Sequence, residues 1–148
     1  MNLNDLLGKS RSELEALFSA SEAGPIPEGN SEGDAIALAG SFWDRLIARF
    51  VHDLVWQGKV FSRNSDGATT LLNKIGPDGV RAVLAQVYYT ESWFDGKKCV
   101  VLDYSKSTLL ARKIRDEIRM VDPAGRIYLG IVWWGKTRLI DFALKFPA

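Results

Sequence analysis

Apolar and polar residues alternate along the last two-thirds of the chain, in short runs separated by turn residues. Alternation with a period of two is the pattern of a half-buried β-strand. The runs cover residues 58–62, 69–74, 81–90, 98–105, 113–121, 126–133 and 138–146, and a further run covers 34–38. The pattern therefore predicts about eight strands, spaced as in small sandwiches and barrels.

Tight-turn sequences lie between several of these runs. Asp95-Gly96 and Asp122-Pro123-Ala124-Gly125 predict antiparallel hairpins on either side. Residues 105–112 are long enough for a parallel crossover, or for a bulged or helical turn. We predict an antiparallel β-barrel, because closure removes exposed strand edges. A strongly curved open sheet fits the same pattern.

Two stretches have a helical period instead. Ser10 and Glu13 stand at capping-box spacing and apolar residues follow three and four positions apart, which predicts a helix over residues 10–20. A second amphipathic helix is predicted near 42–56, over about four turns. Its apolar stripe is wide enough to cover or plug one side of a sheet.

The chain has the size of a single domain. Its 148 residues are 47% hydrophobic, which is sufficient for a substantial core. Residues 23–33 hold two prolines and three glycines and predict an irregular connector. We therefore expect a mainly β (α+β) domain over 1–148. Residues 1–33 would form a helical extension and connector, and 34–148 the barrel with the helix near 42–56.

Charge and hydropathy exclude several classes of function. The 19 basic and 18 acidic residues nearly cancel, and basic runs are no longer than pairs such as Lys97-Lys98, so we expect no nucleic-acid partner. No stretch approaches the roughly 18 apolar residues of a membrane span, and Met1–Asp5 does not resemble the start of a signal peptide. The single cysteine favours a reducing compartment, so we expect a cytoplasmic location.

Metal and cofactor chemistry has little sequence support. The chain holds no Gly-x-Gly-x-x-Gly, P-loop, Gly-x-Ser-x-Gly or zinc-spaced motif. A dyad of His52 and Cys99 is an alternative, but their contexts favour a surface imidazole and a buried, inert thiol. Asp116 and Glu117 are adjacent in a strand and point to opposite faces, so they cannot share an ion unaided. We expect no metal and no cofactor.

Asp116 is the most informative candidate residue. It shares one face of its predicted strand with Ile114, Ile118 and Met120. If that face is the interior, desolvation raises the pKa of Asp116 unless a cation or a hydroxyl pairs with it. Such a carboxylate would orient a ligand or act as an acid–base group. A purely structural pairing with an arginine or a backbone amide is the alternative.

Asp103 and Tyr104 raise the same question, because alternation directs only one of them inward. A tyrosine hydroxyl beside a carboxylate would give a pocket a polar floor, whereas an aspartate at a strand end also caps turns. Lys59 shares a face with Phe61 and would meet an acidic head group at a pocket mouth. The alternative is that the aliphatic stem of Lys59 packs on the surface and its amine is solvated.

Large rings are abundant, with five tryptophans, four tyrosines and seven phenylalanines. Trp133 and Trp134 are neighbours in a strand and therefore face opposite sides. Trp56 and Trp133 are candidates for the wall of an aromatic-lined cavity. Simple core packing is the alternative for both.

Several of these segments carry a family resemblance. They are Trp56-Gln57-Gly58-Lys59-Val60-Phe61, Asp103-Tyr104, the strand at 114–121 and Tyr128-Leu129-Gly130. In this order they resemble a group of bacterial proteins of unassigned function with a lipocalin-like (calycin-type) barrel. More loosely, residues 56–146 resemble GXWXG/DUF4334-type proteins. The resemblance implies a small lipocalin-like barrel and no established activity.

These observations favour a barrel that binds one small hydrophobic ligand, such as a lipid or fatty-acid-like molecule. The candidate ligand-binding residues are Asp103, Tyr104, Asp116, Arg119, Trp56, Lys59 and Trp133. The alternative is an enzyme, an isomerase, cyclase or hydrolase, that acts on a hydrophobic small molecule with Asp116 or Asp103 as acid–base group. A third alternative is an interaction module that docks through its N-terminal helix. The oligomeric state stays open.

Overall fold

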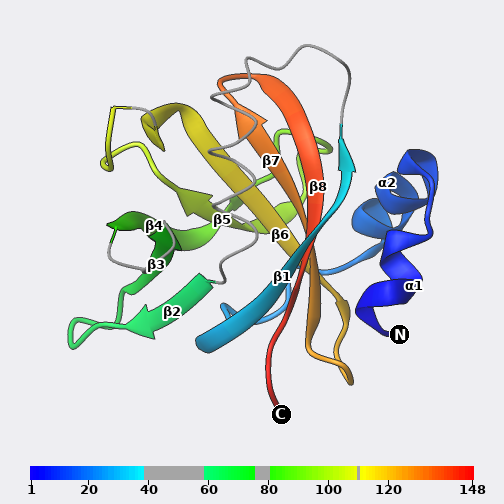
Figure 1. Cartoon of the computed structure of the whole chain (residues 1–148), viewed down its shortest axis with the longest axis horizontal. Coiled ribbons are helices and arrows are strands. Elements are labelled where there is room, and N and C mark those ends of the chain that lie inside the picture. The colour runs from blue at the N-terminus through cyan, green and yellow to red at the C-terminus, as the bar shows by residue number, and fades with distance from the viewer. Residues whose placement is uncertain (39–58, 76–80, 110) are drawn as a thin grey trace.

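The computed structural model describes residues 1–38, 59–75, 81–109 and 111–148. The N-terminal helices are α1 (Leu3–Leu7) and α2 (Arg11–Ala20). The strands are β1 (Gly29–Leu38), β2 (Lys59–Arg63), β3 (Thr69–Ile75), β4 (Arg81–Glu91), β5 (Lys98–Asp103), β6 (Ile114–Asp122), β7 (Ile127–Trp134) and β8 (Thr137–Lys145), with a short 3-10 helix, η1 (Ala111–Lys113), before β6. Figure 1 shows the strands wrapped around one another and the two helices on one side.

The strands form a closed antiparallel barrel in chain order. Each strand pairs with its neighbours in the sequence, and β8 returns to β1 from Glu32↔Lys145 to Leu38↔Ile140. The predicted barrel of about eight strands is confirmed, and the open-sheet alternative is excluded. Residues 105–112 contain no parallel crossover, because β5 and β6 on either side pair antiparallel.

The first strand is the main difference from the prediction. It begins at Gly29, inside the stretch 23–33 that was expected to be a connector. Gly29 has a φ of 89°, a conformation that glycine adopts without strain and that turns the proline-containing segment into the strand. Asn30 and Ser31 then pair with β2, so the barrel starts five residues earlier than the expected Asp34.

The predicted N-terminal helix is confirmed as α2. Ser10 caps it, because the Ser10 hydroxyl accepts a hydrogen bond from the Glu13 amide at 3.3 Å while the Glu13 carboxylate accepts one from the Ser10 amide at 2.7 Å. The five-residue α1 was not predicted. Asn2 and Asp5 form the same reciprocal cap at its start.

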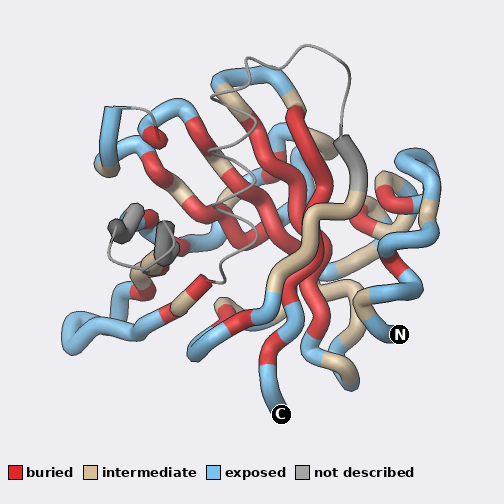
Figure 2. Tube along the Cα trace, in the orientation of Figure 1, coloured by how far each residue is buried: buried red, intermediate tan, exposed pale blue. Residues whose placement is uncertain are grey.

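The barrel interior is packed with apolar side chains from every described wall. Figure 2 shows the buried positions concentrated along β6, β7 and β8. The cluster includes Phe61, Leu71, Val87, Val100, Leu102, Ile114, Ile118, Tyr128, Val132, Ile140 and Phe142.

A second core lies outside the barrel wall, under the helices. Leu6, Leu14 and Phe18 of α1 and α2 pack on the outer side chains of β7 and β8, among them Leu129 and Ile131. This double packing explains why β7 is buried on both faces. The apolar stripe of the predicted helix therefore docks on the sheet.

Part of the prediction lies outside the described residues, namely the helix near 42–56 with Trp56 and His52. Among the helices that the structure does describe, none is long and apolar enough to cross a membrane.

Candidate functional site

A buried ion pair crosses the barrel interior. Lys59 is the first residue of β2 and Asp116 is the third residue of β6. In the closed ring of eight strands, three strands separate β2 from β6 in either direction, so the two residues project from opposite walls. Lys59 Nζ lies 3.2 Å from Asp116 Oδ2, and the side chains are 0% and 2% exposed.

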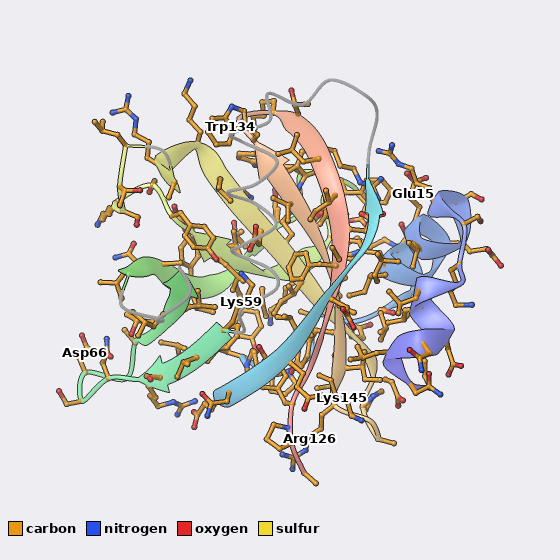
Figure 3. All side chains as sticks on the ribbon, viewed as in Figure 1. Glu15, Lys59, Asp66, Arg126, Trp134 and Lys145 are labelled. Carbon is orange, nitrogen blue, oxygen red and sulfur yellow. The ribbon has the colours of Figure 1, made fainter. Side chains whose placement is uncertain are left out.

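Tyr104 is the third polar member of this cluster. It follows β5 directly, two residues after Leu102, which pairs with Asp116 in the sheet. Its hydroxyl accepts a hydrogen bond from Lys59 Nζ at 3.0 Å and donates one to Asp116 Oδ2 at 3.4 Å. A lysine, an aspartate and a tyrosine thus meet in the barrel, and Figure 3 shows Lys59 near the middle of the molecule.

The start of β2 is fixed by its neighbour β1. Ser31 pairs with Lys59 across the two strands, and the buried Ser31 hydroxyl donates to the Lys59 carbonyl at 3.2 Å. This contact orients the backbone of Lys59, and alternation then directs the side chain inward together with Phe61.

Apolar side chains surround the cluster, which we call the Lys59–Asp116–Tyr104 cluster. Lys59 Nζ lies 5.6 Å from the ring centroids of both Tyr104 and Phe142. Phe142 comes from β8 and lies directly opposite Gly130 of β7. The absence of a side chain at Gly130 leaves the space that the Phe142 ring occupies.

Burial shifts the pKa values of the two ionisable groups, Lys59 and Asp116, in opposite directions. Desolvation raises the pKa of Asp116, although Lys59 and Tyr104 oppose the shift. Desolvation also lowers the pKa of Lys59, against the attraction of Asp116. Both shifts favour the neutral forms, an amine and a carboxylic acid.

One carboxylate oxygen of the cluster makes no hydrogen bond to the described residues. Asp116 Oδ1 is buried and has no hydrogen-bond partner among the described residues. An unpartnered buried oxygen costs about 1–3 kcal/mol, and more when it is charged. The cluster is therefore a polar site with unused hydrogen-bonding capacity in an apolar interior.

The structure brings together three of the residues singled out from the sequence: Lys59, Tyr104 and Asp116. Asp116 faces the interior and is paired with both a cation, Lys59, and a hydroxyl, that of Tyr104, rather than with the arginine or backbone amide of the structural alternative. The Lys59 side chain is completely buried in the interior, so the alternative interpretation of Lys59 as a lysine with a solvated amine is wrong. Its partner lies 57 residues further along the chain, and no local pattern points to it.

Asp103 points away from the cluster, because the alternation of β5 turns Tyr104 inward. The Asp103 carboxylate accepts hydrogen bonds from the Tyr88 hydroxyl at 2.7 Å and from the Ser105 amide at 2.8 Å. These contacts place Asp103 on the outer wall and match its alternative role as a turn cap.

Arg119 also lies outside the barrel, buried between β6 and α2. Its guanidinium donates to both carboxylate oxygens of Asp95 at 2.6 Å and to the Phe18 carbonyl at 3.0 Å. Arg119 therefore connects α2 and the β4–β5 turn to the wall.

Trp133 belongs to the outer core under the helices. Its ring makes an edge contact with Trp93 at 5.9 Å between centroids, and its buried indole N–H has no hydrogen-bond partner among the described residues. Trp134 points the other way and packs against the inner cluster, as alternation predicts.

Glu117, next to Asp116, confirms that the two carboxylates face opposite sides. It is fully buried outside the barrel and accepts hydrogen bonds from the Ser92 hydroxyl at 2.5 Å, the Trp93 amide at 2.7 Å and Arg115 at 3.1 Å. In the described parts of the chain, no three His, Cys, Asp or Glu residues gather as a metal site would require.

Cys99 is buried in the wall of the barrel. Burial, together with the nearby Glu117 carboxylate, raises the pKa of the Cys99 thiol to about 12. This environment suppresses the nucleophilic thiolate, in agreement with the predicted inert thiol.

The connector before β1 covers one end of the barrel. Ile26 packs against the inner cluster. The hydroxyls of Tyr89 and Tyr128 donate to the carbonyls of Gly24 at 2.9 Å and Pro25 at 2.8 Å. A hollow of about 360 Å³ is lined by this connector, and another of about 590 Å³ lies beside the start of β1 and the C-terminal residues; both include Arg126 and Phe146. Neither hollow is lined by a member of the Lys59–Asp116–Tyr104 cluster.

Comparison with known proteins supports the fold. A crystal structure of a protein from Thermomonospora curvata matches with a TM-score of 0.60 and 19% identity, over 95% of this chain and 89% of that one. No protein-family model matches the sequence. No curated protein matches it either. The barrel implied by the sequence resemblance is present, and membership of a lipocalin-like or GXWXG/DUF4334-type family stays a prediction.

Proposed function

We propose that this protein binds one small hydrophobic molecule, of lipid or fatty-acid-like character, inside its barrel. The polar end of the molecule would meet the Lys59–Asp116–Tyr104 cluster. The observation that carries the proposal is the presence of an ion pair with an unpartnered carboxylate oxygen inside an otherwise apolar barrel.

The energetics of the cluster support a role beyond packing. Desolvation of two buried charges cancels most or all of their attraction, and replacing such a pair with apolar residues is often neutral or stabilising. Stability alone therefore does not explain the lysine and the aspartate. A ligand whose polar group bonds to Asp116 Oδ1 would use the capacity that the fold leaves unused.

The architecture supports the same proposal. The interior of an eight-stranded barrel is just wide enough to be filled by side chains or to hold one small ligand, as in lipocalins. Recognition in such sites comes from an apolar wall with a few convergent polar groups. The single buried Cys99 fits a reducing, cytoplasmic setting for this binding.

The first test is native mass spectrometry of freshly purified protein, with organic extraction of any bound molecule. We expect a stoichiometric hydrophobic compound, or saturable one-to-one binding of an added fatty acid such as decanoic acid. The variant Asp116→Asn should change the affinity at least tenfold, while the exposed-site control Lys145→Met should not. No copurified compound and no saturable binding would overturn the proposal.

Acid–base catalysis on a hydrophobic substrate is the second candidate function. The specific observation is a carboxyl group with a raised pKa beside a tyrosine hydroxyl. A catalytic carboxyl needs a pKa close to the working pH, which burial provides. Asp116→Asn would then abolish turnover of the extracted compound while leaving its binding measurable. Equal turnover in both proteins would reject this candidate.

A further inference from the structure

We propose that the polar group of the ligand is an aldehyde or ketone carbonyl, and that Lys59 Nζ condenses with it to form an imine, with Asp116 as the proton carrier. The inference rests on the proposed function and deepens it, because it names the class of ligand and the bond that holds it. The covalent chemistry belongs to Lys59, and Asp116 and Tyr104 assist it.

The position of Lys59 distinguishes it from the other lysines. Among the lysines whose side chains the structure describes, Lys59 alone is buried, and it lies in an apolar environment beside a carboxyl group and a phenol. An exposed lysine is almost fully protonated at neutral pH and does not attack carbonyls efficiently. Burial lowers the pKa of Lys59, so a larger fraction of its side chain is the unprotonated, nucleophilic amine.

Asp116 donates and accepts the protons that the condensation requires. The lone pair of Lys59 Nζ attacks the carbonyl carbon, and the carbonyl oxygen takes the proton of the Asp116 carboxyl group. The nitrogen returns a proton to Asp116, giving a neutral carbinolamine. Asp116 then protonates the hydroxyl group, water leaves and the C=N bond forms. Amine, carboxylic acid and carbonyl thus become protonated imine, carboxylate and water, with no oxidant or reductant.

The product fits the cluster as well as the starting state does. The protonated imine places a positive charge on the Lys59 nitrogen, 3.2 Å from the Asp116 oxygen that becomes a carboxylate oxygen in the same reaction. The Tyr104 hydroxyl lies 3.0 Å from Lys59 Nζ, close enough to donate a hydrogen bond to the oxygen of the carbinolamine. The two opposite charges of the product therefore lie side by side and stabilise each other in the apolar interior.

A carbonyl suits this site better than a carboxylate does. A ligand carboxylate that paired with Lys59 would lie next to Asp116, and two neighbouring carboxylates repel unless one takes up a proton. A carbonyl compound adds no charge and uses the proton of Asp116 productively. Binding of a carboxylate without covalent chemistry is thus the competing outcome of the test.

The test uses the full chain with decanal as the probe and sodium cyanoborohydride to reduce any imine to a stable amine. After reaction at pH 7, peptide mapping gives the labelling rate of each lysine. We expect Lys59 to be labelled at least tenfold faster than the exposed Lys136 and Lys145 of the same molecule. This internal comparison in the unaltered protein does not depend on any variant folding.

Two variants sharpen the result. Lys59→Arg keeps the positive charge but cannot form the imine, so the rapid label should disappear while the surface background stays. Asp116→Asn should slow labelling of Lys59 about 100-fold, the usual contribution of general acid–base catalysis. Urea denaturation of both variants shows whether they are folded before the rates are compared.

Binding without chemistry separates this inference from the proposed function. Calorimetry with decanol and decanoic acid measures one-to-one binding of unreactive analogues. If these bind and decanal labels only surface lysines, the imine inference is overturned and the binding function stands. If neither the analogues nor decanal occupies the protein, both are overturned. Rapid labelling at Lys59 that depends on Asp116 supports both.

Discussion

The ring of Phe142 occupies the space in which a Cβ of Gly130 would lie. A Cβ built at residue 130 would be 2.3 Å from the Phe142 Cζ atom, far inside van der Waals contact. The two residues are direct partners in the β7–β8 pair, and the Phe142 ring lies 5.6 Å from Lys59 Nζ. The glycine therefore sets the position of an aromatic ring in the wall of the candidate site.

Gly130→Ala should destabilise the protein by about 1–3 kcal/mol, the usual range for overpacking a well-packed core. It should also weaken ligand binding, because the displaced ring moves within the interior that holds Lys59. Urea denaturation measures the first effect and calorimetry with decanoic acid the second.

Gly8→Ala is the matched control, since a Cβ at Gly8 meets nothing within 4 Å. It should leave stability and binding close to those of the unaltered protein. Equal stability of Gly130→Ala and Gly8→Ala would contradict the assigned role of Gly130.

The ion pair between Lys59 and Asp116 predicts strongly non-additive variants. Lys59→Met or Asp116→Leu alone should destabilise the fold by about 3–5 kcal/mol, because each leaves an uncompensated buried group. The double variant should regain most of that loss, since apolar residues of similar volume replace a desolvated pair. Urea denaturation of the four proteins gives the coupling free energy.

The exposed pair of Arg63 and Glu28, 2.8 Å apart, provides the comparison. Arg63→Met should have no measurable effect on stability, because solvent screens such pairs. A double variant of Lys59 and Asp116 as unstable as either single variant would show that the pair stabilises the fold. It would also remove the energetic reason for a functional role.

The contact between Arg119 and Asp95 predicts a loss of stability in acid. Hydrogen bonds from the Arg119 guanidinium lower the pKa of Asp95 below its ordinary value of 3.8. A group with a lowered folded-state pKa contributes stability above its unfolded pKa, and that stability is lost as the pH falls through the folded value.

Asp95→Asn should therefore cost about 1.5–3 kcal/mol at pH 7, the range for hydrogen bonds to charged groups. The difference in the free energy of unfolding between Asp95→Asn and the unaltered protein should become smaller below pH 3.8. Chemical denaturation at pH 7 and pH 3 measures both values, with Glu91→Gln, an exposed carboxylate of the same hairpin, as control. An equal difference in the free energy of unfolding at both pH values would contradict the link between the lowered pKa of Asp95 and stability.

Cys99 should resist alkylation in the folded protein. Its thiol is buried and its pKa is raised to about 12, so the thiolate is scarce at pH 8. Iodoacetamide should label the protein fully in urea and hardly at all without it, as measured by intact mass. Complete labelling of the native protein within minutes would show that Cys99 is an accessible and reactive thiol.

The strands were predictable because their signals are local. Alternation and turns such as Asp95-Gly96 place the elements within a few residues, and only the start of β1 was missed. There Gly29 and the prolines before it have the composition of a loop although the backbone already pairs with β2. The short α1 had one recognisable signal, the spacing of Asn2 and Asp5 as a cap.

The candidate site was only partly predictable, because it depends on contacts between opposite walls. Alternation offered Asp103 or Tyr104 as the inward residue, and the position of the next strand decides between them. Lys59 has the sequence context of a surface lysine, and its burial depends on Asp116. Arg119 faces outward, as its strand pattern indicates, and is buried beneath α2 and the β4–β5 turn.

The pairing of β1 with β8 has a consequence for how the chain folds. Seven of the eight strand pairs join neighbours in the sequence, whereas β1 and β8 are separated by nearly the whole barrel. During synthesis on the ribosome, β1 and β7 therefore both expose unpaired edges until residues 137–145 have emerged. Unpaired edges promote aggregation of partly folded chains. The nascent protein is thus most exposed to aggregation just before its barrel closes.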